Sequence, residues 1–170
     1  MGFIKWLLNA QSEWEQKQKN RGSVRDDYYI DNDPWAYDDP KVIRYSKIYY
    51  DNLGKLEERY SIIYNMGLIE GDEVDAFIRL CEQNIIDFKR YKEACMPYKE
   101  EMPCSVPAYK RLAMIYEKQG RYRDAIEICA TAINNGVIDD GTKGRMRGRL
   151  ARLIRKYDGD LPDSILKLLD

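Results

Sequence analysis

The sequence predicts an all-α protein made of antiparallel helical hairpins. Apolar residues recur every three or four positions through most of residues 40–156, which is the period of an amphipathic helix. Glycine, proline and asparagine separate these periodic segments, as they do at helix boundaries. No segment alternates apolar and polar residues in the way that a half-buried strand does. These three observations favour helices joined by short turns.

The chain has 170 residues, a length that suits one domain with a helical appendage. Its formal net charge is −1, but the two parts of the chain differ: residues 1–105 hold 15 basic and 20 acidic side chains, and the remainder hold 13 and 9. The two parts are therefore expected to attract each other or to meet different partners. The abundance of Lys, Ile, Tyr and Asn is typical of bacterial or phage proteins.

Residues 1–25 are expected to form an N-terminal amphipathic helix, over residues 3–18, and a polar linker. Phe3, Trp6 and Leu7 give this helix an apolar face that should dock on the protein's own core or on a second copy, with a membrane surface as the alternative. Residues 26–39 form an acidic and aromatic loop. Its aromatic side chains are a possible recognition segment, since aromatic residues often anchor interfaces; they are Tyr28, Tyr29, Trp35 and Tyr37.

The helical domain should cover residues 40–170 and begin with two long helices. Asp39 can cap the first helix and Pro40 fits its first position, while Gly67 is a natural stop. Asp72 can cap the second helix, which should end before Pro97. A short link joins the two helices, so they should pack antiparallel.

A second hairpin is predicted at residues 107–136. It reads Tyr109-x2-Leu112-Ala113-x2-Tyr116, then Ala125-x3-Cys129, with Gly120 at the turn between the two helices. Small residues stand where the helices should touch, namely Ala113, Ala125 and Ala132. This stretch resembles one tetratricopeptide repeat, a helical hairpin of about 34 residues, although Tyr109, Ala113 and Cys129 replace the usual Trp, Gly and Phe. The resemblance implies a right-handed helical array or small bundle that binds other proteins.

The resemblance also implies where a partner would bind. In this family the exposed face of a repeat's first helix lines a groove for a peptide, and the matching positions here are Lys110, Met114, Glu117 and Lys118. A simple solvated face is the alternative interpretation of the same residues.

A basic helix should follow at residues 142–156, because this stretch holds seven cations and no acid. Four of the cations fall on one ridge beside the apolar stripe: Arg145, Arg149, Arg152 and Lys156. A row of guanidinium groups can bind phosphates, so nucleic acid is a possible partner. The ridge is equally suited to pairing with acidic groups of the chain itself or of a protein.

No catalytic set is visible in the sequence. The chain has no histidine, no glycine-rich phosphate loop and no nucleophile elbow. The four cysteines show no metal-binding spacing, so we expect four free thiols in a reducing cytoplasm, with a Cys95–Cys104 disulfide as the alternative. No apolar run is long enough to cross a membrane. The sequence therefore predicts a non-catalytic adaptor without cofactor or metal that binds a protein or peptide, with nucleic-acid association as the alternative.

Overall fold

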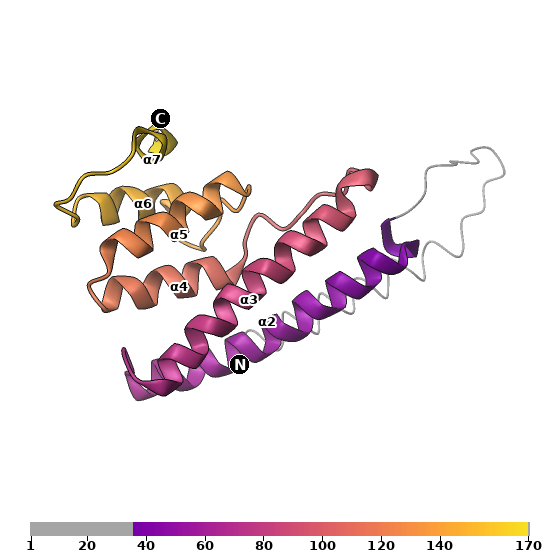
Figure 1. Cartoon of the computed structure of the whole chain (residues 1–170), viewed down its shortest axis with the longest axis horizontal. Helices are drawn as coiled ribbons and strands as arrows, with labels where there is room; N and C mark the ends of the chain where they lie inside the picture. The colour runs from indigo at the N-terminus through magenta and orange to yellow at the C-terminus, as the bar shows by residue number, and fades with distance from the viewer. Residues whose placement is uncertain (1–35, 170) are drawn as a thin grey trace. The chain divides into compact units, whose positions relative to one another are not determined.

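The computed structural model describes residues 36–169, and every regular element in this range is helical (Figure 1). Six α-helices and three short 3-10 turns follow one another, and no strand occurs among these residues. The prediction of an all-α protein made of helical hairpins is confirmed. The predicted N-terminal helix, with Phe3, Trp6 and Leu7, lies outside the described residues. Most of the 26–39 loop lies outside them too, and its last residues, Ala36–Asp38, form the 3-10 turn η1.

Helix α2 spans Pro40–Met66 and has both of its predicted ends. The carboxylate of Asp39 accepts a hydrogen bond of 2.7 Å from the backbone N–H of Lys41. Such a cap satisfies one of the N–H groups that the first helical turn leaves free. Gly67 closes the helix at a φ of 65°, in the left-handed region that glycine adopts at little cost.

Helix α3 spans Asp72–Cys95 and runs antiparallel to α2. The hydroxyl of Tyr98, in the 3-10 turn η2 (Met96–Tyr98) that follows α3, donates to Asp39 at 2.7 Å. This bond joins the end of α3 to the start of α2 and lowers the pKa of Asp39. The prediction that Asp72 caps α3 is wrong: Gly71 holds the cap position at a φ of 98°, and Asp72 is the first helical residue.

Helices α4 (Pro107–Lys118) and α5 (Tyr122–Asn134) form the second predicted hairpin. Ala113, Ala125 and Ala132 are fully buried, as the sequence predicts for the positions where the two helices touch. Methyl side chains allow helix backbones to approach closely, because a larger group would hold them apart.

Helix α6 spans Arg145–Ile154 and packs on α5; a short helix, α7 (Asp163–Leu166), and the 3-10 turn η3 (Lys167–Leu169) end the described chain. The sequence predicts a longer basic helix, over residues 142–156, and this prediction is wrong at both ends. The carboxylate of Asp140 accepts hydrogen bonds from both the backbone N–H and the hydroxyl of Thr142. This side chain therefore holds a turn where the helix would otherwise start.

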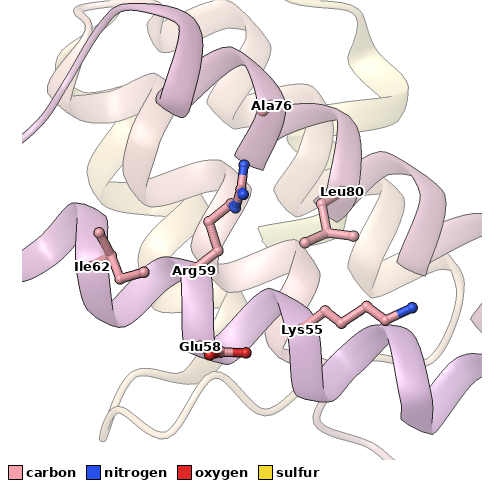
Figure 2. Close-up of a pocket in the computed structure, with 6 residues that line it drawn as sticks. All are labelled: Lys55, Glu58, Arg59, Ile62, Ala76 and Leu80. Atoms are coloured by element: carbon pink, nitrogen blue, oxygen red, sulfur yellow. The ribbon is translucent and has the colours of Figure 1, made fainter.

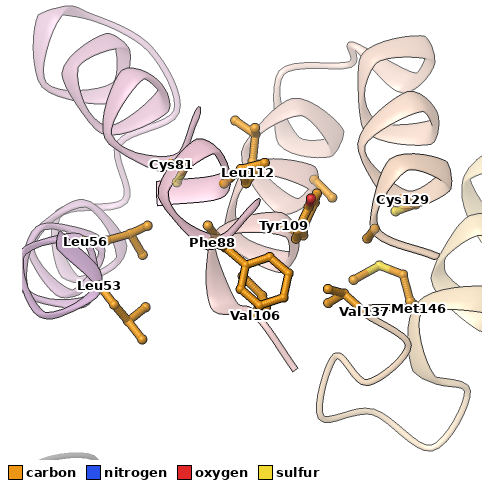
Figure 3. Close-up of a cluster of buried hydrophobic side chains, with 14 of the residues drawn as sticks. Leu53, Leu56, Cys81, Phe88, Val106, Tyr109, Leu112, Cys129, Val137 and Met146 are labelled. Carbon is orange, nitrogen blue, oxygen red and sulfur yellow. The ribbon is translucent and has the colours of Figure 1, made fainter. Parts of the chain in front are cut away.

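One hydrophobic core runs through the helices from α2 to α6 (Figure 3). Large buried side chains of the first hairpin, such as Leu56 and Phe88, continue into Tyr109 and Leu112 of α4. Helix α6 continues this core with Met146, Leu150 and Leu153. The two hairpins therefore share a core within this part of the chain.

Candidate partner-binding face

The outer face of α4 carries the four residues that the sequence predicts for a groove. Lys110, Met114 and Lys118 follow one another at intervals of four residues, and Glu117 lies beside them on the helix surface. Met114 is half-buried and packs against the core, while Lys118 is exposed. The structure thus places an apolar contact between two cations on this face.

The carboxylate of Glu117 lies close to three cations, two on α6 and one just after its end. Its Oε1 atom lies 2.8 Å from the ammonium of Lys156, and its Oε2 atom lies 3.5 Å from a guanidinium nitrogen of Arg152. Arg149 approaches the same Oε2 atom at 3.8 Å. Partial burial raises the pKa of the Glu117 carboxyl, but the hydrogen bond from Lys156 and the charge of Arg152 outweigh it, so the pKa lies below its usual value.

Arg149 belongs to the interior and not to an exposed ridge. Its side chain is 7% exposed, and its Nε–H group donates to the buried carboxylate of Asp140 at 2.8 Å. Burial raises the pKa of Asp140, whereas the hydrogen bonds from Thr142 and Arg149 lower it by more. Arg149 therefore fixes the loop before α6 to the helix itself.

The predicted ridge on α6 is divided by these contacts. Arg145 is exposed and has no ion-pair partner among residues 36–169, while Arg152 and Lys156 are half-exposed and share Glu117. The groove residues of α4 and the cations of α6, predicted as separate sites, therefore meet at one carboxylate. We call the surface formed by Lys110, Met114, Glu117, Lys118, Arg152 and Lys156 the α4–α6 face.

The adjoining side of α4, next to Lys118, is tied to α2. Arg111 donates to both carboxylate oxygens of Glu57, at 3.1 and 2.8 Å, and its guanidinium lies 3.8 Å from the centre of the Tyr60 ring. Such a bidentate and stacked arrangement is specific to arginine. Burial lowers the pKa of Arg111, and Glu57 raises it by more. The cation therefore stays charged and holds the two hairpins together.

Lys110 and Lys118 have no carboxylate partner within residues 36–169. The ammonium of Lys118 lies 5.6 Å from the centre of the Tyr64 ring, a weak attraction for an exposed group. The ammonium nitrogen of Lys110 lies close to the turn at Gly141, 3.5 Å from the position that a Cβ atom on Gly141 would take. Two positive charges of this face thus remain available to an anionic group.

A separate cavity lies between α2 and α3, away from the predicted site (Figure 2). Its volume is about 450 Å³, and its walls are formed by Lys55, Glu58, Arg59, Ile62, Ala76 and Leu80. Arg59 pairs with Glu73 at 3.3 Å, and both side chains are largely exposed. The charged groups around the cavity thus have opposite signs, and their chemistry selects no particular ligand.

Sequence reasoning missed a polar seam in the α2–α3 interface. Asp87, 2% exposed, accepts hydrogen bonds from Asn52 at 2.7 Å and Gln83 at 2.9 Å. Asn84 is fully buried and donates to the backbone carbonyl of Tyr49 at 3.0 Å, while its Oδ1 atom has no partner in the described structure. The signal in the sequence was two polar residues, at positions 84 and 87, on an otherwise apolar helix face.

The cysteines of the described chain are all free. Burial raises the pKa of the Cys129 thiol to about 12 and also raises that of Cys81, so both stay protonated at neutral pH and pack as small apolar groups. Within residues 36–169, no three histidine, cysteine, aspartate or glutamate side chains are grouped closely enough to hold a metal ion. No helix among them is both long and apolar enough to cross a bilayer.

The proposed aromatic recognition segment is almost entirely outside the described residues. Tyr28, Tyr29 and Trp35 precede residue 36, and for Tyr37 the structure gives only the backbone, in η1. These residues stay a prediction from the sequence.

Comparisons with protein-family models, with curated proteins and with solved structures gave no match. A function proposed for the chain therefore rests on the geometry of its own side chains.

Proposed function

We propose that this chain is a non-catalytic protein-binding module, and that its α4–α6 face binds an acidic segment of another protein. The observation that carries the proposal is the row on α4, where half-buried Met114 stands between Lys110 and Lys118. An apolar contact flanked by uncompensated cations is suited to a peptide that carries both an apolar side chain and carboxylates.

Two further features support this proposal. The sequence of α4 and α5 resembles a tetratricopeptide repeat, and the resemblance implies that the first helix of the hairpin faces the partner. The bidentate pair between Arg111 and Glu57, whose side chains are 21% and 12% exposed, holds α4 against α2. A face fixed in this way binds with little loss of conformational entropy.

Nucleic acid is the less favoured partner. Arg149 pairs with the buried Asp140, and Arg152 and Lys156 pair with Glu117, so a phosphate backbone would meet the Glu117 carboxylate beside the two half-exposed cations. The free thiols of the described chain suit a reducing compartment, and we propose an intracellular location on that ground.

A peptide-display experiment tests the proposed function. Twelve-residue peptides are selected from a random library against the full chain, and their dissociation constants are measured by calorimetry. We expect acidic peptides with an apolar residue, and a loss of affinity of about tenfold or more in the double variant Lys110→Glu and Lys118→Glu, because two attractive charges become repulsive.

The matched control combines Arg79→Glu with Lys89→Glu, which makes the same total charge change at two exposed positions of α3. Peptides that bind the double variant as tightly as the wild type would contradict the proposal. Tight binding of a labelled 20-nucleotide DNA, weakened steeply between about 50 and 200 mM salt, would instead support the nucleic-acid alternative.

A further inference from the structure

Arg152 and Lys156 are the cations of the α4–α6 face that share a partner. Their side chains are 43% and 45% exposed, so an external group can reach both of them. Within residues 36–169, Glu117 is the one carboxylate within ion-pair distance of either cation. Two cations therefore share one negative charge, and a second carboxylate placed there would be attracted to the uncompensated charge.

Arg149 is not available to a second carboxylate in the way that Arg152 and Lys156 are. Asp140 holds its Nε atom at 2.8 Å, and Glu117 is a more distant second contact at 3.8 Å. Arg149 is buried, whereas the two half-exposed cations have Glu117 as their only carboxylate partner within residues 36–169. Ion pairs between exposed or half-exposed side chains are weak and exchange readily, because water solvates each group almost as well as its partner does.

We propose that Arg152 and Lys156 bind an acidic side chain of the partner segment, and that Glu117 is an internal competitor for the same two cations. This inference rests on the proposed function, because it names the chemistry of the partner at that face. Glu117 then sets the affinity: it keeps the two cations in position when the face is empty, and it opposes the incoming carboxylate by like-charge repulsion.

A fluorescein-labelled hexaglutamate peptide is a suitable probe, with binding to the full chain measured by fluorescence anisotropy at low salt. We expect Glu117→Gln to bind the probe about 2- to 5-fold more tightly than the wild type, since the carboxylate that both half-exposed cations share is removed. The matched control is Glu127→Gln on α5, which removes the same charge from an exposed residue paired only with Arg123. An affinity gain in Glu117→Gln no larger than that in Glu127→Gln would overturn the inference.

A second test uses a double variant, and its result does not depend on how well Glu117→Gln folds. Arg152→Ala combined with Lys156→Ala keeps Glu117 and the buried Arg149, and we expect it to bind hexaglutamate about 5-fold more weakly or worse, because both exposed cations are gone. Unchanged binding in this double variant would also overturn the inference. Circular dichroism confirms that each variant keeps its helical content.

The two proposals fail in distinguishable ways. If Lys110→Glu with Lys118→Glu weakens probe binding while the Glu117 and Arg152 variants leave it unchanged, the binding face stands and the role of Glu117 is refuted. If none of these variants alters probe binding, the face itself is refuted.

Discussion

The two hairpins of this protein pack their helices with different kinds of side chain. In the α4–α5 hairpin, alanines at positions 113, 125 and 132 are fully buried between short helices. In the α2–α3 hairpin, aromatic rings such as Tyr49 and Phe88, with centroids 5.6 Å apart, lie between longer helices, and a polar seam accompanies them. Small buried side chains allow helices to approach closely, whereas large ones hold them further apart. The cavity described above lies between α2 and α3.

Because of this difference, the two interfaces should be destabilised by different kinds of substitution. The α2–α3 interface contains the buried amide of Asn84 and the buried carboxylate of Asp87, so a second acidic group there should be costly. Three alanines of the α4–α5 hairpin are fully buried, so this hairpin should be sensitive to side-chain volume. Four substitutions probe this contrast and the contacts around it, and their expected effects decrease from the first to the last.

Asn84→Asp should destabilise the protein by about 3–5 kcal/mol at pH 7, because a carboxylate would replace the amide that donates to the Tyr49 carbonyl. Burial raises the pKa of a carboxyl, so part of the lost stability should return as the pH is lowered and the group is protonated. Urea unfolding followed by circular dichroism measures the change. The control Asn84→Leu should stay within about 1 kcal/mol of the wild type, since the unsatisfied oxygen is removed as well. Equal stability of the two variants would show that the seam tolerates charge.

Ala113→Leu should lower the free energy of unfolding by about 1–3 kcal/mol, because the fully buried methyl stands where α4 meets α5. The matched change is Ala76→Leu on α3, beside the cavity of about 450 Å³ between α2 and α3. Its effect should be within about 0.5 kcal/mol, since space for the larger side chain already exists. If both variants lose the same stability in urea unfolding, the proposed contrast between the interfaces is wrong.

Arg111→Lys tests the contact between the two hairpins. Lysine cannot make both hydrogen bonds to Glu57 or stack on Tyr60, so we expect a loss of about 1–2 kcal/mol in thermal or urea unfolding. Arg123→Lys, in an exposed pair with Glu127 on α5, should cause no measurable change. A neutral result for Arg111→Lys would mean that the shared core alone joins the hairpins.

Gly54→Ala should stabilise the protein by about 0.5–1 kcal/mol. Gly54 lies inside α2, and an added Cβ atom would meet nothing within 4 Å. Alanine restricts the unfolded chain and favours the helix. Gly67→Ala is the opposite case, because the φ of 65° at the end of α2 is strained for alanine and should destabilise by about 1 kcal/mol. A thermal shift of the same sign in both variants would contradict the expected roles of these two glycines.

The helix ends could be predicted because their causes are local. Asp39 caps α2 through a residue two positions away, and Gly67 ends the same helix through its own backbone conformation. The late start of α6 was missed, although its cause is also local, because the sequence does not reveal which of several polar side chains will hold a turn. The groove residues of α4 were predicted from the resemblance to a tetratricopeptide repeat, and the cations of α6 from their spacing, but the partners of these residues were not predicted.

The sequence by itself determined the helices, their order and the apolar faces that they bury, since these follow from periodicity, caps and turn residues within a few positions of each other. Only the tertiary structure decided that Lys156 meets Glu117, 39 residues away, and that Arg111 meets Glu57 at a separation of 54. It also decided that Arg149 is interior while Arg152 is not. Such pairings depend on how helices cross and on which side of each helix remains uncovered, and these properties arise only when the helices pack together.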